Sequence, residues 1–132
     1  MADGNLVSDY MVRGVACASL WQPVSFARQQ MLTNSFSYLP LLTQSNGQDT
    51  WCLLSDISVA KYLQSDDKKQ RLGQTIEKAI QDDLLKVERA HYCCVDCTIA
   101  AALDKFNGHP LLIVDKNKPN VLLGIVTPFD LL

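Results

Sequence analysis

Apolar residues recur at helical and then at strand spacing, and this order occurs twice along the chain. The first predicted helix follows Pro23 and has apolar residues three or four positions apart or adjacent, at Val24, Ala27, Met31 and Leu32. Short apolar runs predict strands over 38–42 and 50–54, joined by a turn at Asn46-Gly47, where the backbone tolerates positive φ. A second helix is predicted to begin at Ser55.

The second half repeats this order of elements. Thr98 is a good N-cap for a helix over 99–106, because its hydroxyl can accept a hydrogen bond from a free N–H of the first turn. Strands are predicted over 109–114 and 121–126, with a polar turn between them. Another helix begins near Thr127, and we expect it to be truncated at the end of the sequence.

The two halves align with small gaps, which predicts a tandem pair of small α/β units. The matched positions are Ala27 with Ala102, 40–42 with 110–112, and 52–55 with 124–127. We therefore expect a first repeat over 1–64, a helical connector over 65–88 and a second repeat over 89–132. In the connector, a charged run leads into apolar residues that predict one amphipathic helix: Leu72, Ile76, Ala79, Ile80, Leu84 and Val87.

Composition indicates a globular protein of the reducing cytoplasm. The 132 residues are 48% hydrophobic and 20% charged, and a net charge of -2 gives no electrostatic basis for binding nucleic acid or an anionic membrane. No apolar stretch is long enough for a membrane span, and the N-terminus has neither the basic nor the apolar region of a signal peptide. Five cysteines without regular spacing are typical of free thiols.

The order of elements and several stretches resemble a tandem pair of cystathionine-β-synthase (CBS) domains, often called a Bateman module. The stretches are VSDYMVRG, QPVSFARQQMLTNSFSYLPLL and WCLLSDISVAKYL in the first copy, and CTIAAALDKF, HPLLIVD and GIVTPFDLL in the second. The resemblance covers nearly the whole chain. It implies an α/β (α+β) fold, in which each repeat is a small mixed β-sheet with helices on one face, and pseudo-two-fold symmetry between the repeats.

The stretch TPFD at 127–130 fits two roles. As a capping box, the Thr127 hydroxyl and the Asp130 carboxylate each accept a backbone N–H of the other residue, and Pro128 suits the first helical position. As a ligand site, the helix start offers unpaired N–H groups to a phosphate, while the carboxylate can accept both hydroxyls of a ribose. Gly124 lacks a Cβ and would let a ligand approach the strand closely.

The resemblance assigns this pattern to an adenosine-containing nucleotide, namely AMP, ADP, ATP or S-adenosylmethionine, in a cleft between the repeats. Asp130 would bind the ribose, and Thr127 the ribose-phosphate region. The adenine would lie against residues at the start of the second copy and ahead of its central strand: His91, Tyr92, Cys93, His109 and Pro110. Tyr92 can stack on a purine, although a tyrosine in a strand is more often part of the core.

The first copy departs from this pattern. Ser55 and Ser58 stand at the positions of Thr127 and Asp130, and Cys52 replaces the glycine. A serine has no charge and a single hydroxyl, so Ser58 cannot hold both hydroxyls of a ribose. We therefore predict one nucleotide site per chain and a degenerate second site at Ser55 and Ser58.

No nucleophile–base arrangement, P-loop or dinucleotide fingerprint indicates an enzyme. The predicted function is a regulatory module that senses the nucleotide and requires no cofactor. Two alternatives stay open: a ligand-free dimerisation module, and a zinc or redox element in the cluster from His91 to Cys97. Cys94-x-x-Cys97 has the spacing of a zinc knuckle, but no second Cys-x-x-Cys or His pair follows, and His109 could be a distant fourth ligand only if the fold brought it close. The expected partners are a second copy, in a homodimer, and an effector domain or protein.

Overall fold

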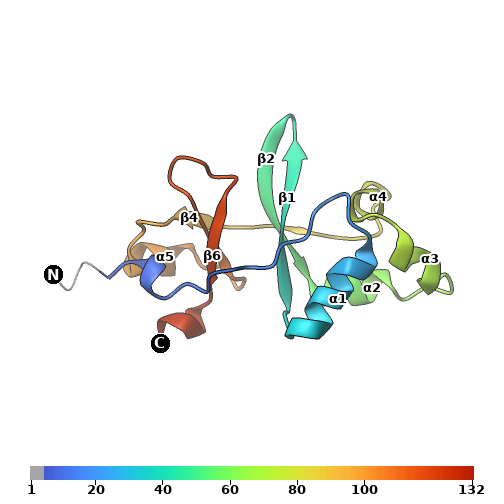
Figure 1. The fold of residues 1–132 in the computed structure, drawn as a ribbon, viewed down its shortest axis with the longest axis horizontal. Coiled ribbons are helices and arrows are strands. Elements are labelled where there is room, and N and C mark those ends of the chain that lie inside the picture. Colours follow the sequence, from blue (N-terminus) through green and yellow to red (C-terminus); the bar gives the residue numbers. More distant parts are fainter. Residues whose placement is uncertain (1–4) are drawn as a thin grey trace. The chain divides into compact units, whose positions relative to one another are not determined.

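The computed structural model describes residues 5–132 (Figure 1). The first four residues lie outside the described part of the chain. The start of the predicted first repeat lies there, and so does the start of the N-terminal stretch interpreted as lacking a signal peptide. Two compact units divide the chain: the central unit, residues 16–89, and the C-terminal unit, residues 5–15 with 90–132. The repeat bounds at residues 64 and 88 stay a prediction. Within 5–132, no helix is both long and apolar enough to cross a membrane.

The central unit contains a three-stranded sheet and four helices. Its elements are α1 (Val24–Asn34), β1 (Tyr38–Ser45), β2 (Gln48–Ser55), α2 (Asp56–Tyr62), α3 (Lys68–Gly73), α4 (Ile76–Gln81) and β3 (Glu88–Arg89). β1 and β2 form an antiparallel hairpin, and β3 pairs antiparallel with the other edge of β2 (Figure 1). The predicted turn is confirmed, because Asn46 and Gly47 have φ of 53° and 78°, as a two-residue hairpin loop requires.

One face of this sheet carries the core of the central unit. Leu39, Leu41 and Leu54 of the sheet are fully buried. They belong to one cluster with side chains of α1, α2 and α4: Val24, Ala27, Met31, Val59, Tyr62, Ile76 and Ala79. Helices therefore cover one face of the sheet, as predicted, and burial of these apolar side chains is the main source of stability.

The predicted single connector helix is wrong, because the chain forms two short helices there. Thr75 has an extended backbone and caps α4, accepting a hydrogen bond from the Lys78 N–H at 3.1 Å. Backbone hydrogen bonds join Gln74 and Ile76 to the segment 22–24, ahead of α1. These bonds hold Thr75 in an extended conformation between α3 and α4, whereas a continuous helix would need helical backbone angles at this residue.

The end of the connector also differs from the predicted helical pattern. Ile76 and Ala79 are buried as expected, but Leu84 is 47% exposed and its neighbour Leu85 is buried instead. α4 ends at Gln81 and Asp83 adopts a left-handed conformation, with φ of 61°. The left-handed residue ends the helical periodicity, so spacing no longer predicts which side chain faces the core.

The C-terminal unit contains a second three-stranded sheet with its helices. Its elements are η2 (Val7–Asp9), β4 (Tyr92–Cys94), α5 (Ile99–Lys105), β5 (Leu111–Val114), β6 (Leu122–Val126) and η3 (Pro128–Leu131). β4 and β5 are parallel and β5 and β6 antiparallel, so the sheet is mixed. Thr98 caps α5 as predicted. The helix expected near Thr127 is a short 3₁₀ helix, η3.

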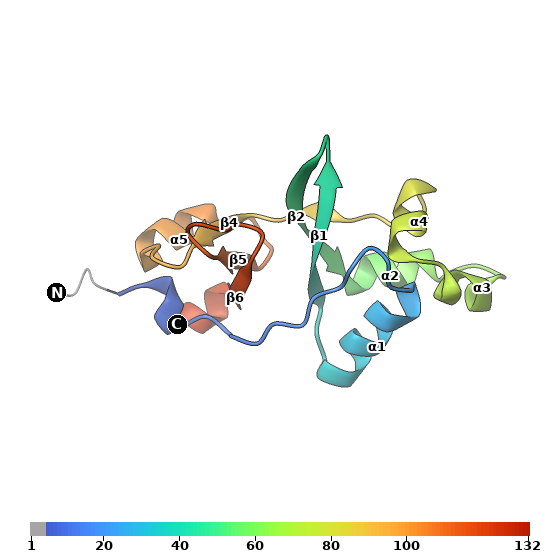
Figure 2. The same cartoon turned by 45° about the horizontal axis from the view of Figure 1, so that its top comes forward.

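α5 lies over one face of this sheet (Figure 2). The core there is formed by buried side chains of the sheet, α5 and the N-terminal segment: Val7, Met11, Cys93, Ala102, Leu111, Ile113 and Val126. Val12 and Ile125 exchange backbone hydrogen bonds of 2.8 and 3.1 Å, so the N-terminal segment runs along the outer edge of β6. β3 occupies the corresponding edge of β2 in the central unit.

The strand registers correct the predicted match between the two halves. Leu54 pairs with Leu39, and Val126 pairs with Leu111. When β1 is aligned with β5 and β2 with β6, residue 39 corresponds to residue 111 and residue 54 to residue 126. Each pair is 72 positions apart in the sequence. The match of Pro40 with Pro110 is wrong by two residues, although the match of 52–55 with 124–127 agrees with this register. Burial supports the correction, because both members of each pair are core residues.

Candidate functional site

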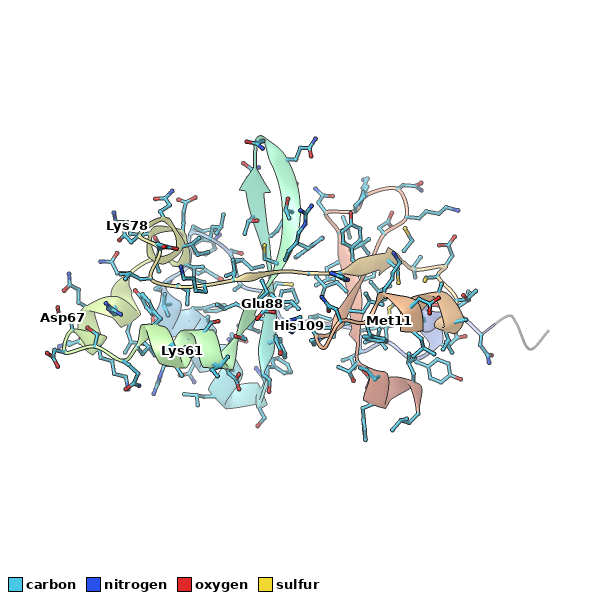
Figure 3. All side chains as sticks on the ribbon, turned by 180° about the vertical axis from the view of Figure 1, so that it is seen from behind. Met11, Lys61, Asp67, Lys78, Glu88 and His109 are labelled. Carbon is cyan, nitrogen blue, oxygen red and sulfur yellow. The ribbon has the colours of Figure 1, made fainter. Side chains whose placement is uncertain are left out.

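Most of the predicted nucleotide-binding residues lie at one end of the sheet β4–β5–β6. Because β4 and β5 run parallel, His91 and Pro110, which precede them, lie at the same end of the sheet. β6 runs antiparallel to β5 and pairs its last residue with Leu111, so Thr127 follows at this same end. Figure 3 labels His109, in the loop ahead of β5. The topology thus brings together residues that are 36 positions apart in the sequence, from 91 to 127.

Thr127 and Asp130 form the predicted capping arrangement at the end of β6. The Asp130 Oδ2 atom accepts the backbone N–H of Thr127 at 2.9 Å and the Thr127 hydroxyl at 3.1 Å. Pro128 occupies the first position of η3. Asp130 is half-buried, and both hydrogen bonds described for its carboxylate use Oδ2. The second oxygen, Oδ1, is therefore the atom that can accept a hydrogen bond from a ligand.

His91 is fixed by the end of α5. Its Nδ1 lies 3.1 Å from the carbonyl oxygen of Lys105, and its Nε2 lies 3.1 Å from the side-chain amide nitrogen of Asn107. A carbonyl accepts and an amide NH₂ donates, so these partners fit the neutral tautomer with its proton on Nδ1. Nothing in the sequence could have predicted the contact between Asn107 and His91, because it depends on the path of the chain after the end of α5.

Tyr92 and Cys93 are adjacent on β4 but face opposite sides of the sheet. The Tyr92 side chain is 44% exposed, whereas the Cys93 thiol is buried in the core of the C-terminal unit. Burial, followed by a hydrogen bond with Cys97, raises the pKa of Cys93 to about 12. Of these two residues, only Tyr92 can contact a bound base with its side chain. Cys93 can contribute only its backbone groups.

The missing side chain at Gly124 is explained by Met11. A Cβ on Gly124 would lie 2.5 Å from the Met11 Sδ atom and 3.0 Å from the Val12 carbonyl oxygen. Met11, labelled in Figure 3, therefore fills the space on that side of β6. Sequence reasoning missed this contact, because it joins segments more than a hundred residues apart. A role for Gly124 in ligand binding stays a prediction.

In the central unit, Ser55 and Ser58 bond to each other. Ser55 is buried and caps α2, accepting the Ser58 N–H at 3.1 Å, and the two hydroxyl oxygens lie 3.0 Å apart. This pair repeats the position of Thr127 and Asp130 without a carboxylate. Its hydroxyls already serve as partners for one another, and the degenerate second site stays a prediction.

The cysteine cluster does not form a recognisable metal site. Among residues 5–132, no group of three or more His, Cys, Asp or Glu side chains is placed to hold a metal ion. No disulfide joins any of the five cysteines, all of which lie in the described part of the chain. Burial also raises the pKa of Cys17, in the central unit. The zinc alternative therefore finds no support in this geometry.

Comparison with known proteins identifies the second half of the chain. Residues 82–132 match the family model of the CBS domain. This stretch is a CBS domain. No relative was found among curated proteins. The CBS match begins ahead of β3 and so includes the strand that pairs with β2 in the central unit.

Solved structures extend the CBS fold over the whole chain. A CBS domain-containing protein of unknown function from Bacillus anthracis has a TM-score of 0.70 at 17% identity, covering 95% of this chain and 88% of that one. CBSX2 in complex with AMP has a TM-score of 0.65 at 19% identity, covering 96% and 92%. Hypoxic Response Protein I with two coordinated zinc ions has a TM-score of 0.63 at 17% identity, covering 96% of each chain. The resemblance to a tandem CBS pair and the predicted fold class are thereby confirmed.

Proposed function

We propose that this CBS module is a regulatory element that binds one adenosine-containing nucleotide and has no catalytic activity of its own. The nucleotide would bind at the end of the sheet β4–β5–β6, with its ribose on Asp130. The observation that supports this most strongly is the half-buried Asp130 carboxylate just past β6, at the end of the sheet where the residues that precede β4 and β5 also lie. CBSX2, which shares the fold, was solved in complex with AMP.

The hydrogen bonds of Asp130 define how a ribose would be held. Oδ2 already accepts two hydrogen bonds from Thr127. A ribose hydroxyl would therefore donate to Oδ1, and the second hydroxyl would share that oxygen or displace the Thr127 hydroxyl. A hydrogen bond to an ionised carboxylate contributes about 1.5–3 kcal/mol, so the loss of one hydroxyl from the ligand should reduce affinity measurably.

The base would meet backbone groups and one aromatic side chain. Tyr92 is exposed enough to stack on a purine, and His109 and Pro110 lie ahead of β5 at the same end of the sheet. His91 is held by α5 and would shape this edge through its backbone. The purine would thus be recognised mainly by shape and by backbone hydrogen bonds.

The regulatory effect would come from differential binding. A nucleotide that prefers one arrangement of the module over another shifts the population toward it, by a coupling of about 1–3 kcal/mol in typical cases. The recipient would be an effector domain or protein. Cysteines that form no disulfide within residues 5–132 support a reducing compartment, such as the cytoplasm, as the place of action.

Thermal-shift measurements test the proposal. The parent protein is screened with AMP, ADP, ATP, S-adenosylmethionine, 2′-deoxy-AMP and zinc chloride. A ligand at 100 times its dissociation constant raises the free energy of unfolding by about 2.7 kcal/mol. We expect at least one ribonucleotide to raise the melting temperature, and 2′-deoxy-AMP to raise it less than AMP. A response to zinc alone, or to none of these ligands, contradicts the proposal.

We also infer self-association through α1 and α2 of the central unit. A groove of about 250 Å³ lies between them, with buried apolar side chains at its base: Met31, Val59 and Leu63. Leu32 on its rim is 62% exposed. The rim also carries Asp56 as well as Arg28 and Lys68. A surface with both charges around an apolar base can complement its own copy across a two-fold axis.

Light scattering after gel filtration tests this inference. Leu32→Glu should convert a dimer to a monomer, because it places a charge in the apolar interface. Leu103→Glu is the matched control, since Leu103 on α5 is 51% exposed but belongs to the C-terminal unit. A monomeric parent protein, or an equal effect of both substitutions, contradicts the inference.

A further inference from the structure

A cavity of about 190 Å³ lies among the helices α2, α3 and α4 of the central unit, lined by residues of all three and of the segments that follow α3 and α4. It is larger than the ~150 Å³ cavity that holds a benzene molecule, and smaller than the ~300 Å³ at which pockets for drug-sized ligands begin. It therefore fits a metabolite of several non-hydrogen atoms but not a nucleotide.

Arg71 presents a guanidinium to this cavity in a fixed position. The guanidinium donates to the Tyr62 carbonyl at 2.6 Å and lies 5.2 Å from the centre of the Tyr62 ring, and the Tyr62 hydroxyl donates to the Arg71 carbonyl at 3.0 Å. A guanidinium has five N–H donors, of which the described bond uses one. The others can hold a carboxylate through two parallel hydrogen bonds, and little side-chain freedom would be lost because the group is already anchored.

Two carboxylates line the same cavity, Asp67 ahead of α3 and Asp82 at the end of α4. Lys78 forms an ion pair with the Oδ1 atom of Asp82 at 3.1 Å, so Oδ2 is the atom that can accept a hydrogen bond from a ligand. A carboxylate at the C-terminal end of a helix opposes the helix dipole, so the stability of α4 does not explain Asp82. An ammonium group bound there would be attracted both by this carboxylate and by the last carbonyl groups of α4.

The rest of the lining is apolar or carries neutral amides. Ala79 is buried, and Leu84 is 47% exposed. Asp83 has a φ of 61° and turns the chain back after α4, so that the Leu84 N–H donates to the Ala79 carbonyl at 3.1 Å and Leu84 reaches the cavity. Gln70 and Gln74 add side-chain amides. The cavity thus combines one cation and two carboxylates with an apolar wall and hydrogen-bonding amides.

We propose that this cavity binds a free α-amino acid with a short polar side chain, its carboxylate on Arg71 and its ammonium group on Asp82. An α-amino acid carries both charges on groups attached to one carbon atom, as a small cavity lined by both charges requires. A simple anion would be repelled by the carboxylates, and a simple cation by Arg71. The side chain would lie against Ala79 and Leu84 and bond to the Gln74 amide. The site lies wholly in the central unit and does not depend on the proposed nucleotide site.

The bound amino acid would join α3 to the end of α4, on either side of the extended residue Thr75. Binding should be weak, in the millimolar range, because Arg71 is only half-buried and the Asp82 side chain is 42% exposed, and ion pairs in contact with water contribute little. The Gln74 N–H, which donates to the Arg71 carbonyl at 3.3 Å, should exchange with solvent more slowly in the complex.

Amide NMR spectra of the isotope-labelled whole chain, titrated with L-serine, L-asparagine and L-glutamine, test the proposal. At least one of these amino acids should shift the amide signals of Arg71, Gln74 and Leu84 along a curve that saturates. Its N-acetyl derivative lacks the positive charge and its carboxamide derivative lacks the negative one, so each should bind about fivefold more weakly.

Two neighbouring substitutions locate the site. Asp82→Asn keeps the size of the side chain, removes its charge and should weaken binding about fivefold. Asp83→Asn is the matched control, because Asp83 pairs with Lys86 but is not among the described residues that line the cavity, and asparagine also accepts its left-handed backbone. The proposal is overturned if none of the three amino acids shifts these signals, if both blocked derivatives bind as well as the amino acid, or if Asp82→Asn binds like Asp83→Asn.

Discussion

The carboxylate of Asp130 holds both the backbone N–H and the hydroxyl of Thr127, through the same oxygen. Replacing Thr127 with valine keeps the shape and the N–H but removes the hydroxyl. We expect the free energy of unfolding to fall by about 0.5–1.5 kcal/mol, the usual contribution of one hydrogen bond. Urea denaturation measures it. An unchanged midpoint would show that the hydroxyl bond contributes nothing to the end of β6.

Gly124→Ala tests the close approach of the N-terminal segment to β6. The added Cβ would meet the Met11 Sδ atom at 2.5 Å and the Val12 carbonyl oxygen at 3.0 Å. Overpacking of this kind costs about 1–3 kcal/mol, which urea denaturation resolves. Met11→Ala should recover part of that loss in the double variant, because it removes the flexible side of the clash. Additive effects of the two substitutions would contradict the contact.

Tyr62→Phe tests how α3 is attached to α2. The Tyr62 hydroxyl donates to the Arg71 carbonyl at 3.0 Å, and the Arg71 guanidinium donates to the Tyr62 carbonyl at 2.6 Å and lies 5.2 Å from the centre of the ring. Loss of the hydroxyl leaves a carbonyl without this donor, and we expect a destabilisation of about 1–2 kcal/mol. Tyr10→Phe, on a tyrosine that is 44% exposed, is the comparison. Equal losses in both would contradict a specific attachment.

Alkaline pH should destabilise the protein through Cys93. Its pKa in the fold is about 12, against an ordinary value of 9.0. Between these values unfolding releases a proton, so the folded state binds more protons and stability falls as pH rises. The slope is at most about 1.4 kcal/mol per pH unit from this one group. Urea midpoints from pH 8 to pH 11 should fall more steeply in the parent than in Cys93→Ala, and parallel slopes would contradict the buried thiol.

The local elements follow from the sequence because their signals are local. The Asn46-Gly47 turn requires positive φ at two positions, and the cap at Thr98 depends on its own first turn. The capping of η3 by Asp130 was also predicted from spacing. These features need no information about distant segments.

The remaining features depend on contacts that no local pattern records. Pairing of Val12 with Ile125 joins segments from opposite ends of the sequence, and Met11 thereby fills the space at Gly124. The break at Thr75 depends on bonds to residues 22–24. The match of Pro40 with Pro110 failed because it was based on both residues being proline. The true alignment of the two halves is set by the register of strand pairing, which the sequence does not show.

The most direct test of the nucleotide site is isothermal titration of AMP into three proteins: the parent, Asp130→Asn and Ser58→Ala. Asp130→Asn keeps the size of the side chain and removes the charge that would receive the ribose hydroxyls. Ser58→Ala makes the corresponding change in the first copy. We predict one AMP bound per chain, at least about tenfold weaker binding to Asp130→Asn, equivalent to about 1.4 kcal/mol, and unchanged binding to Ser58→Ala. Equal affinity of the parent and Asp130→Asn would contradict the account.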